Sequence, residues 1–117
     1  MAKISMRKGE VWLINLDPTI GAEIRKTRPA VIVSEDVIGI LPLRVIVPLT
    51  DWKDRYAGAS WMVRINPDAK NGLEKASAAD ALQIRSVSQE RFVRCIGSLQ
   101  TKQLNEIISA IQVVIGA

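Results

Sequence analysis

The stretch of the chain best suited to chemistry is the run from Gly9 to Ser34, GEVWLINLDPTIGAEIRKTRPAVIVS. Both ends of this run are apolar and rich in β-branched residues, which is typical of strands. Its middle is a loop with fixed charges, and a loop held between rigid strands is a common place for a functional site in a small protein. The cations of the loop indicate an anionic ligand. The charged side chains are those of Asp17, Glu23, Arg25, Lys26 and Arg28.

Histidine is absent from the sequence, and Cys95 is the single cysteine. Histidine bases, Ser-His-Asp triads and Cys-His pairs are therefore excluded, and neither a zinc site nor another metal centre is expected. Any catalysis must use arginine, lysine, carboxylate or hydroxyl groups. Cys95 stands in the apolar pattern FVRCI, and we interpret it as a small core residue rather than a reactive thiol.

The length of 117 residues predicts a single domain over residues 1–117. Lysine and arginine total 16 against 12 acidic residues, and the resulting net charge of +4 suits an anionic partner. The first nine residues lack the apolar core of a signal peptide, and no apolar run approaches the length of a membrane span. We therefore expect a cytoplasmic protein without a membrane partner.

Beyond the first strand, short apolar segments alternate with turn signals such as Asp17-Pro18 and Asn71-Gly72, which predicts a sheet of short strands. Pro48 lies inside one segment and indicates an edge strand or a bulge. Residues 51–60 are expected to form a long exposed loop, and residues 88–92 a single helical turn. The predicted strands are residues 10–15, 29–34, 44–49, 61–65, 76–84 and 93–97.

The end of the chain predicts one amphipathic helix over residues 101–115, with Gly116 as its stop. Its apolar residues recur at spacings of three and four, and we expect this stripe to serve core and dimer packing. Short strands followed by one helix predict a mainly β, α+β domain whose sheet is strongly bent and barrel-like. The stripe consists of Leu104, Ile107, Ile108, Ile111, Val114 and Ile115.

Four segments in the right order resemble the MazF/PemK-type toxins of bacterial type II toxin–antitoxin systems. They are the run from Gly9 to Ser34, VPLT at 47–50, NGLEKASAADALQIRSV at 71–87, and IGSL at 96–99 before the helix. The resemblance implies an SH3-like β-barrel with a C-terminal helix, and a homodimer. It also implies metal-independent cleavage of single-stranded RNA, often at short sequences, and inhibition by an antitoxin whose acidic disordered segment lies across the RNA groove.

The same resemblance assigns roles to individual residues. The family's catalytic arginine matches Arg28 in its Arg-Pro dipeptide, and its catalytic threonine matches Thr50. The acid of the loop matches Glu23, and a glutamine found near bound RNA in relatives matches Gln83. The chain departs from the family pattern at residues 24–27, where Ile-Arg-Lys-Thr makes a bulkier and more cationic loop, and before Gln83, where a leucine replaces a polar residue.

The implied reaction is an attack of the RNA 2′-OH on the neighbouring phosphorus, which gives a 2′,3′-cyclic phosphate and a 5′-OH end. Arg28 presents five N–H donors in a plane and suits phosphate oxygens, so we expect it to stabilise the transition state. Thr50 is expected to donate to the same phosphate, and Glu23 is the hypothesised base or orienting group. RNA contacts are expected from Arg25, Lys26, Thr27, Trp52, Lys53, Gln83 and Arg85.

Several of these residues also have a purely structural interpretation. Thr50 could end a strand, Glu23 could pair with a neighbouring cation at the surface, and Trp12 and Trp61 fit a core or an interface better than a stacking platform. Two other functions stay open. One is a gyrase poison of the same fold, although the chain ends in VIGA without the Trp-Gly-Ile tail of that subclass. The other is an SH3-like module that binds nucleic acid or protein without catalysis.

Overall fold

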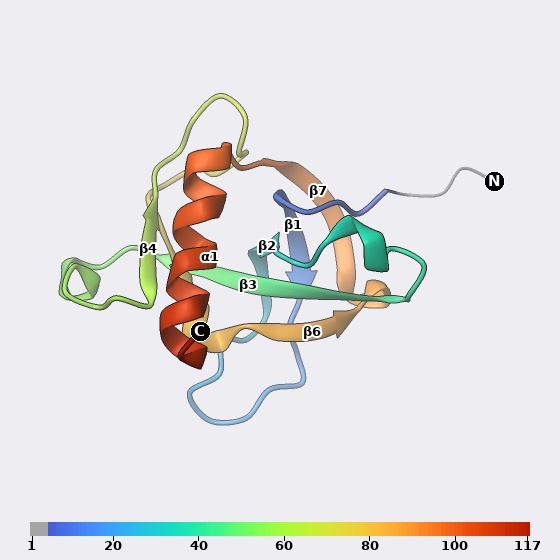
Figure 1. The fold of residues 1–117 in the computed structure, drawn as a ribbon, viewed down its shortest axis with the longest axis horizontal. Helices are drawn as coiled ribbons and strands as arrows, with labels where there is room; N and C mark the ends of the chain where they lie inside the picture. The colour runs from blue at the N-terminus through green and yellow to red at the C-terminus, as the bar shows by residue number, and fades with distance from the viewer. Residues whose placement is uncertain (1–4) are drawn as a thin grey trace.

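The computed structural model describes residues 5–117 and consists of one bent antiparallel sheet and one C-terminal helix (Figure 1). The strands run in the order β4-β5-β3-β2-β1-β7, and β6 pairs with β3. The prediction of a mainly β fold with a C-terminal helix is confirmed. The strands are β1 (Glu10–Asn15), β2 (Thr27–Ile32), β3 (Leu43–Asp51), β4 (Met62–Ile65), β5 (Ser77–Asp80), β6 (Arg85–Ser88) and β7 (Phe92–Ser98).

The longest strand, β3, organises the sheet because it pairs with three other strands. Its first half pairs with β6 over residues 43–46, its end pairs with β5 over residues 49–51, and β2 pairs along its other side. Of the two alternatives predicted for Pro48, an edge strand or a bulge, the edge strand is wrong, since β3 is central. Pro48 is buried opposite Ala30 and lies between the parts of β3 that pair with β6 and with β5, so its missing N–H leaves neither ladder without a donor.

The prediction of a single strand over residues 76–84 is wrong, because this range holds one short strand followed by a 3-10 helix. β5 ends at Asp80, whose side chain accepts a hydrogen bond from the N–H of Leu82 and so begins a short 3-10 helix, Ala81–Gln83. β6 then starts at Arg85 and pairs with the other half of β3. The predicted turn within residues 88–92 is confirmed as a 3-10 helix, Gln89–Arg91.

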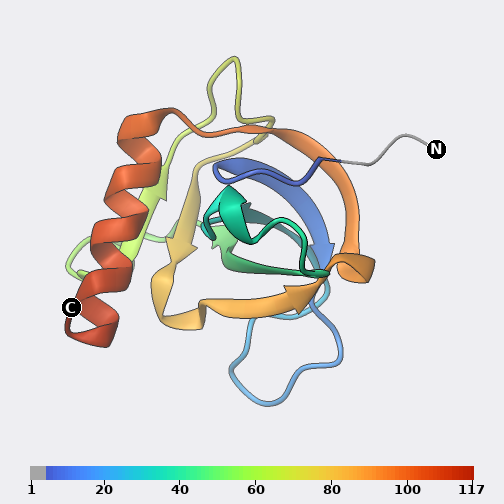
Figure 2. The same ribbon diagram turned by 45° about the vertical axis from the view of Figure 1, so that its right-hand side comes forward.

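Both faces of the central strands are buried, because the sheet curls around one core and the helix covers another (Figure 2). Along β1, Val11 belongs to the core under the helix, whereas Trp12 and Ile14 belong to the core inside the curl. Trp12 packs edge-on against Phe92 with ring centroids 5.4 Å apart, so the prediction of a core tryptophan at position 12 is confirmed. Trp61, in contrast, remains 39% exposed.

The helix α1 (Thr101–Ile115) packs on β4 and on the 81–83 turn, and the side chain of its residue Ile107 is fully buried. Its start is a capping box between Gln100 and Gln103, and it ends at Gly116, which has a left-handed φ of 72° as a helix stop requires. Among residues 5–117, no helix is long and apolar enough to cross a membrane.

The interpretation of Cys95 as a core residue is wrong, since its side chain is exposed. β7 pairs only with β1 in the described sheet, and two irregularities in their register break the simple alternation of faces. Three consecutive residues of β7, at 93–95, are therefore exposed, and the apolar pattern around Cys95 does not report its burial.

Candidate active site

Arg28 and Thr50 meet at a hollow of about 310 Å³ between the start of β2 and the end of β3. Antiparallel pairing of β2 with β3 brings these two strand ends side by side. Each end is also paired on its other side, Arg28 with Ile14 of β1 and Thr50 with Ala78 of β5. We call this hollow the Arg28 pocket. Its polar lining comes from Thr27, Arg28, Thr50, Asp51, Glu74, Lys75, Ser77 and Arg94.

The Arg28 pocket carries both signs of charge and an apolar floor. Leu13, Leu49, Leu73 and Ile96 contribute apolar lining, which suits the flat face of a base or a sugar. Three cations and two carboxylates stand around this floor. A phosphate with its attached nucleoside is therefore well matched to the chemistry of the pocket.

Arg28 is a half-buried residue, and its Nε–H donates to the carbonyl of Arg25 at 3.4 Å. In residues 5–117 this carbonyl is the only hydrogen-bond acceptor of the guanidinium, so its remaining donors are free for a ligand. On the opposite wall, Lys75 Nζ lies 3.1 Å from the carboxylate of Asp51, and both side chains are largely exposed. Such an exposed pair adds little to stability but fixes where the two charges lie.

The loop between Asn71 and Lys75 forms one wall of the pocket. Its backbone is tightly constrained. Asn71 is fully buried, and its side chain donates to the carbonyl of Asn66 and accepts from the N–H of Leu73. Gly72 has a φ of 69°, and a Cβ there would lie 2.0 Å from the carbonyl oxygen of Ile96. The predicted Asn71-Gly72 turn is thus confirmed, and only glycine fits at its second position.

Glu23 does not line the Arg28 pocket. It lies on the β1–β2 loop, where its carboxylate accepts a hydrogen bond of 2.6 Å from the N–H of Ile20. A second, shallower hollow contains Glu23 together with Gln83, which the family resemblance predicted to lie near bound RNA. The structure therefore groups the predicted site residues in two places, Arg28 with Thr50 and Glu23 with Gln83.

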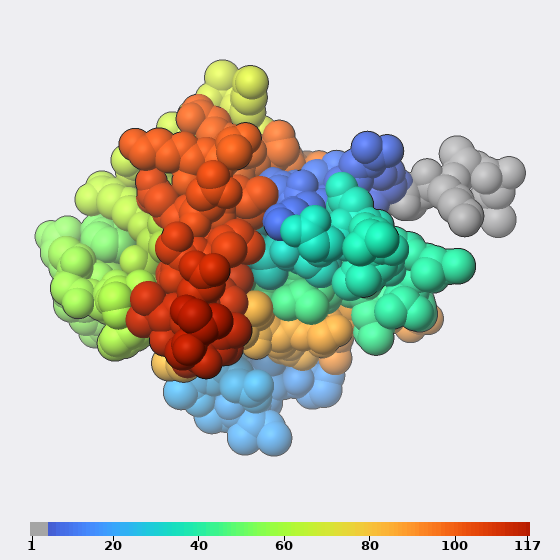
Figure 3. All heavy atoms as spheres, in the orientation of Figure 1, coloured from blue at the N-terminus to red at the C-terminus, as the bar shows by residue number. Residues whose placement is uncertain are grey.

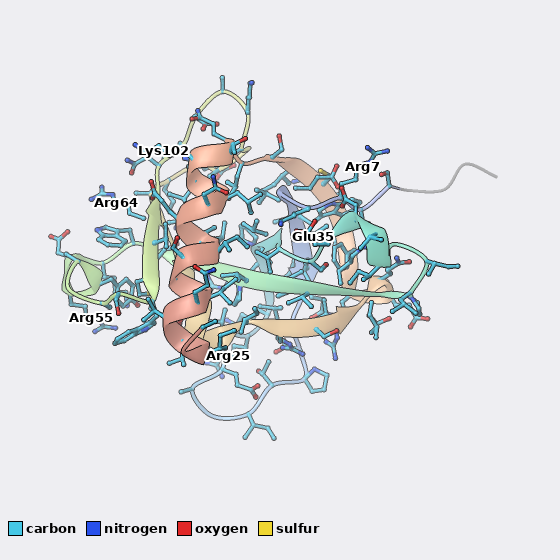
Figure 4. The ribbon with its side chains drawn as sticks, viewed as in Figure 1. Arg7, Arg25, Glu35, Arg55, Arg64 and Lys102 are labelled. Atoms are coloured by element: carbon cyan, nitrogen blue, oxygen red, sulfur yellow. The ribbon has the colours of Figure 1, made fainter. Side chains whose placement is uncertain are left out.

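The remaining predicted RNA contacts lie around these two places. Thr27 lines the Arg28 pocket, while Arg25 and Lys26 are exposed on the loop that precedes it, and Arg25 lies at the foot of the molecule beyond the end of α1 (Figure 4). Lys26 adopts a positive φ of 70°, which is uncommon for a side chain with a Cβ. Arg85 is committed to the loop backbone, since its Nη1 donates to the carbonyl of Leu16 at 3.1 Å.

Trp52 belongs to a separate cluster of aromatic and cationic side chains beside β4. The guanidinium of Arg64 lies 5.2 Å from its ring centroid, and the ring of Tyr56 packs against it edge-on at 5.9 Å. Figure 4 shows Arg64 and Arg55 on this edge of the molecule. Because Arg64 lies over the ring of Trp52, less of that ring is available for base stacking than the sequence suggested, and Lys53 beside it is exposed.

Sequence reasoning missed five charged or polar residues of the Arg28 pocket: Asp51, Glu74, Lys75, Ser77 and Arg94. Asp51 and Lys75 could have been found from their places next to the Pro-Leu-Thr strand and the Asn-Gly turn. Arg94 carries no such local signal, because only the pairing of β7 with β1, which sets it opposite Leu13, brings it to the pocket.

Comparison with known proteins shows the family of the chain. Residues 7–115 match the family model described as PemK-like, MazF-like toxin of type II toxin-antitoxin system. The endoribonuclease MazF9 of Mycobacterium tuberculosis is 33% identical, with 92% of this chain and 93% of that protein covered. The endoribonuclease MazF of Staphylococcus saprophyticus is 31% identical, with 95% and 92% covered.

Solved structures show the same fold. A crystal structure of MazF from Deinococcus radiodurans matches with a TM-score of 0.83 at 20% identity, covering 98% of this chain and all of that one. A mycobacterial endoribonuclease in complex with its cognate antitoxin matches with a TM-score of 0.75 at 18% identity, covering 96% of each chain. From the family match and the identity to curated relatives, the chain belongs to the PemK-like, MazF-like toxins of type II toxin–antitoxin systems.

Proposed function

We propose that this toxin is an endoribonuclease that cleaves single-stranded RNA at preferred short sequences and without a metal ion. The observation that carries the proposal is the Arg28 pocket, which holds Arg28 and Thr50 on adjacent strand ends in a chain whose relatives are named endoribonucleases. The cations of the pocket and its apolar floor fit a phosphate joined to a nucleoside.

In the proposed reaction, the 2′-oxygen bonds to the adjacent phosphorus and the bond from phosphorus to the 5′-oxygen breaks. The 2′-OH loses a proton, the departing 5′-oxygen gains one, and the products are a 2′,3′-cyclic phosphate and a 5′-OH end. Arg28 donates to the non-bridging oxygens, where negative charge accumulates in the transition state. An arginine keeps its proton under physiological conditions, so Arg28 is a stabilising group and not the base. Thr50 donates to the same phosphate from the neighbouring strand.

The proton of the 2′-OH requires an acceptor near this phosphate. Asp51 follows Thr50 directly and is held by Lys75, and Glu74 stands on the facing loop. Both carboxylates line the pocket, whereas Glu23 lies with Gln83 in the second hollow. We therefore propose that Asp51 or Glu74, and not Glu23, is the general base.

We further propose that the toxin works as a homodimer and that a cognate antitoxin inhibits it by laying an acidic, disordered segment over the cations around Arg28. The mycobacterial structure above contains an endoribonuclease with its cognate antitoxin, and MazE-MazF from Deinococcus radiodurans also matches the fold. An acidic segment and an RNA backbone would compete for the same cations.

The test is incubation of the purified protein with a long single-stranded RNA in EDTA, followed by sequencing of the new ends. Discrete cuts with 5′-OH ends are expected from the wild type, and Arg28→Ala should lose them by a factor of about 10² or more while still binding RNA. Arg7→Ala, whose side chain contacts Ser5 away from the pocket, is the matched control and should cut normally. Equal cutting by Arg28→Ala, or no cutting by the wild type, would contradict the proposal and favour a non-catalytic binding module; gyrase inhibition would then be assayed directly.

A further inference from the structure

The β1–β2 loop, residues 16–26, is held in place by side chains that come from about 60 to 75 residues further along the chain. Figures 1 and 2 both show this loop projecting beneath β6. Figure 3 shows the same loop as a protrusion at the foot of the molecule, with its outer side uncovered in that view. Its conformation therefore depends on the attachments at its inner side.

Gln83 makes the most complete of these attachments. Its Oε1 accepts a hydrogen bond from the N–H of Ile24 at 2.5 Å, and its Nε2 donates to the carbonyl of Ala22 at 3.2 Å. One amide group thus satisfies a backbone donor and a backbone acceptor on either side of Glu23. With both of its polar atoms bonded to the loop, Gln83 has little left with which to read an RNA base.

Two arginines attach the start of the same loop. Arg85 Nη1 donates to the carbonyl of Leu16 at 3.1 Å, and Arg91 Nη1 donates to the carbonyls of Asn15 and Asp17. Together with Gln83 they bind the loop backbone at both of its ends through side chains from one stretch of sequence, residues 83–91.

The turn that presents Gln83 is itself fixed. Gln83 ends the 3-10 helix Ala81–Gln83, and Asp80, which is only 6% exposed, begins that helix by accepting from the N–H of Leu82 at 3.1 Å. The buried carboxylate of Asp80 therefore fixes the turn from which Gln83 reaches the loop.

The segment that Gln83 holds leads directly to the Arg28 pocket. Ile24 precedes Arg25, whose carbonyl accepts the hydrogen bond from Arg28 Nε. A shift of the loop at Ile24 would therefore move the exposed cation of Arg25 and change the support of the Arg28 guanidinium. Displacement of the Arg25 cation would weaken the binding of a phosphate backbone, whereas pairing with β1 would keep the backbone of Arg28 in place.

We infer that Gln83 is a positioning residue, which holds the β1–β2 loop so that Arg25 and Arg28 face the phosphates of a single-stranded RNA. The inference rests on the proposed RNA cleavage, and it assigns Gln83 a role through the loop instead of a direct contact with a base. Its effect should fall mainly on the recognition of RNA, because both hydrogen bonds of Gln83 go to the loop, whereas Thr50 and the backbone of Arg28 are held by strand pairing.

The direct test is Gln83→Met, which keeps the length of the side chain and removes both hydrogen bonds. Hydrogen exchange at the Ile24 amide, followed by NMR, should become about tenfold faster or more, because the amide loses its acceptor. With an RNA that carries a mapped cleavage site, KM should rise about tenfold while kcat stays within about threefold. Gln112→Met, at an exposed position of α1, is the matched control and should change neither.

A second variant, Gln83→Glu, adds a pH signature that simple damage to the fold would not give. A neutral carboxyl can accept from Ile24 and donate to Ala22 as the amide does, whereas the ionised form cannot donate. Asp80 and Glu23 stand near this position as carboxylates, and Arg85 is the cation on the following strand. The affinity of Gln83→Glu for an RNA with a 2′-deoxy substitution at the cleavage site should approach that of the wild type at pH 5 and fall below it at pH 8.

Unchanged exchange at Ile24 in Gln83→Met would overturn the inference, as would a loss of kcat with KM unchanged, since that result would place Gln83 at the reacting phosphate. A Gln83→Glu variant whose relative affinity does not depend on pH would also contradict it. If the wild type cut no RNA at all, the proposed function would fail on its own, and the Ile24 exchange would still decide whether Gln83 holds the loop.

Discussion

Arg28 takes its position from two supports of different rigidity. Its backbone is part of β2 and pairs with Ile14, whereas its side chain is oriented by the carbonyl of Arg25 on the loop. The strand β2 fixes the position of the Arg28 backbone, and the loop orients the guanidinium at the end of its side chain. This division separates the placing of the proposed catalytic charge from its fine orientation, and it explains why loop contacts can matter to a residue that stands on a strand.

Glu23→Gln provides a sharp prediction at the same scale. The new amide oxygen can still accept the hydrogen bond from the N–H of Ile20, and position 23 does not line the Arg28 pocket. We expect cleavage rates within about threefold of the wild type, measured with a labelled RNA at saturating concentration. In the same assay, one of the two variants Asp51→Asn and Glu74→Gln should cleave about 10²-fold more slowly than the wild type, or slower still.

A large loss of cleavage in Glu23→Gln, with both pocket variants active, would return the base role to Glu23. It would then require Glu23 to reach the phosphate by a movement of the loop or from a second copy of the chain. Retained binding of RNA by the inactive variant would confirm that the loss concerns the reaction and not the fold.

Individual site residues were predictable only where local sequence carries their signal. Arg28 and Thr50 stand in short, distinctive strings, and the structure places both on one pocket. Arg94 reaches that pocket through strand pairing across about 80 residues, and Cys95 is exposed because of register shifts in β7. Neither outcome can be derived from neighbouring residues, because pairing and register are properties of the folded sheet.

At the scale of elements, the point that sequence could not settle is where β5 ends. Residues 76–84 have the length and the apolar content of one strand, and the alanines weaken any choice between strand and helix. The deciding group is Asp80, whose carboxylate begins the 3-10 helix and directs the next strand to the other half of β3. The signal for a turn that the sequence did contain is the aspartate at position 80 within an otherwise apolar segment.

Asp80 also predicts a response of stability to pH. Burial raises the pKa of its carboxyl above its ordinary value, against the opposing effect of hydrogen bonds from Leu82 and Gln83. Because the native carboxyl takes up a proton at higher pH than the unfolded chain does, ionised Asp80 destabilises the fold at neutral pH, and this effect disappears as pH falls through the raised pKa. Asp80→Asn removes the charge and keeps an acceptor for Leu82. We expect its urea midpoint to exceed that of the wild type at pH 7.5, with the difference shrinking towards pH 4.

Comparison of Asp80→Ala with Asp80→Asn separates the effect of the charge from that of the hydrogen bond, because the alanine lacks both. At pH 4, where the burial penalty no longer offsets it, the lost cap should lower the free energy of unfolding of Asp80→Ala by about 1 kcal/mol. An Asp80→Asn protein that is less stable than the wild type at pH 7.5 would show that the hydrogen bonds of the carboxylate outweigh its burial.

At the scale of the whole molecule, the curled sheet and the helix bury both faces of the central strands, so what remains apolar at the surface is informative. Leu82, Val113 and Ile115 are exposed apolar side chains on elements that pack against one another, α1 and the 81–83 turn, and the exposed Trp61 directly precedes β4, which also packs on α1. The sequence predicted an apolar helix stripe for core and dimer packing. The structure assigns its inner residues to the core and leaves the end of the helix exposed.

We therefore expect these side chains to form the interface of the proposed homodimer, and the dimer to dissociate when charge is placed among them. Leu82 is 61% exposed, so Leu82→Asp should leave the monomer folded, as judged by its thermal transition. Sedimentation should give the wild type twice the 12.9 kDa of the chain and shift Leu82→Asp towards the monomer, because burying an unpaired carboxylate in an interface is strongly unfavourable. Ile40→Asp, at a position 94% exposed in the β2–β3 connection, is the matched control and should remain dimeric. The reverse result, a monomeric Ile40→Asp beside a dimeric Leu82→Asp, would move the interface to the apolar residues around positions 37–43, on the connection opposite α1.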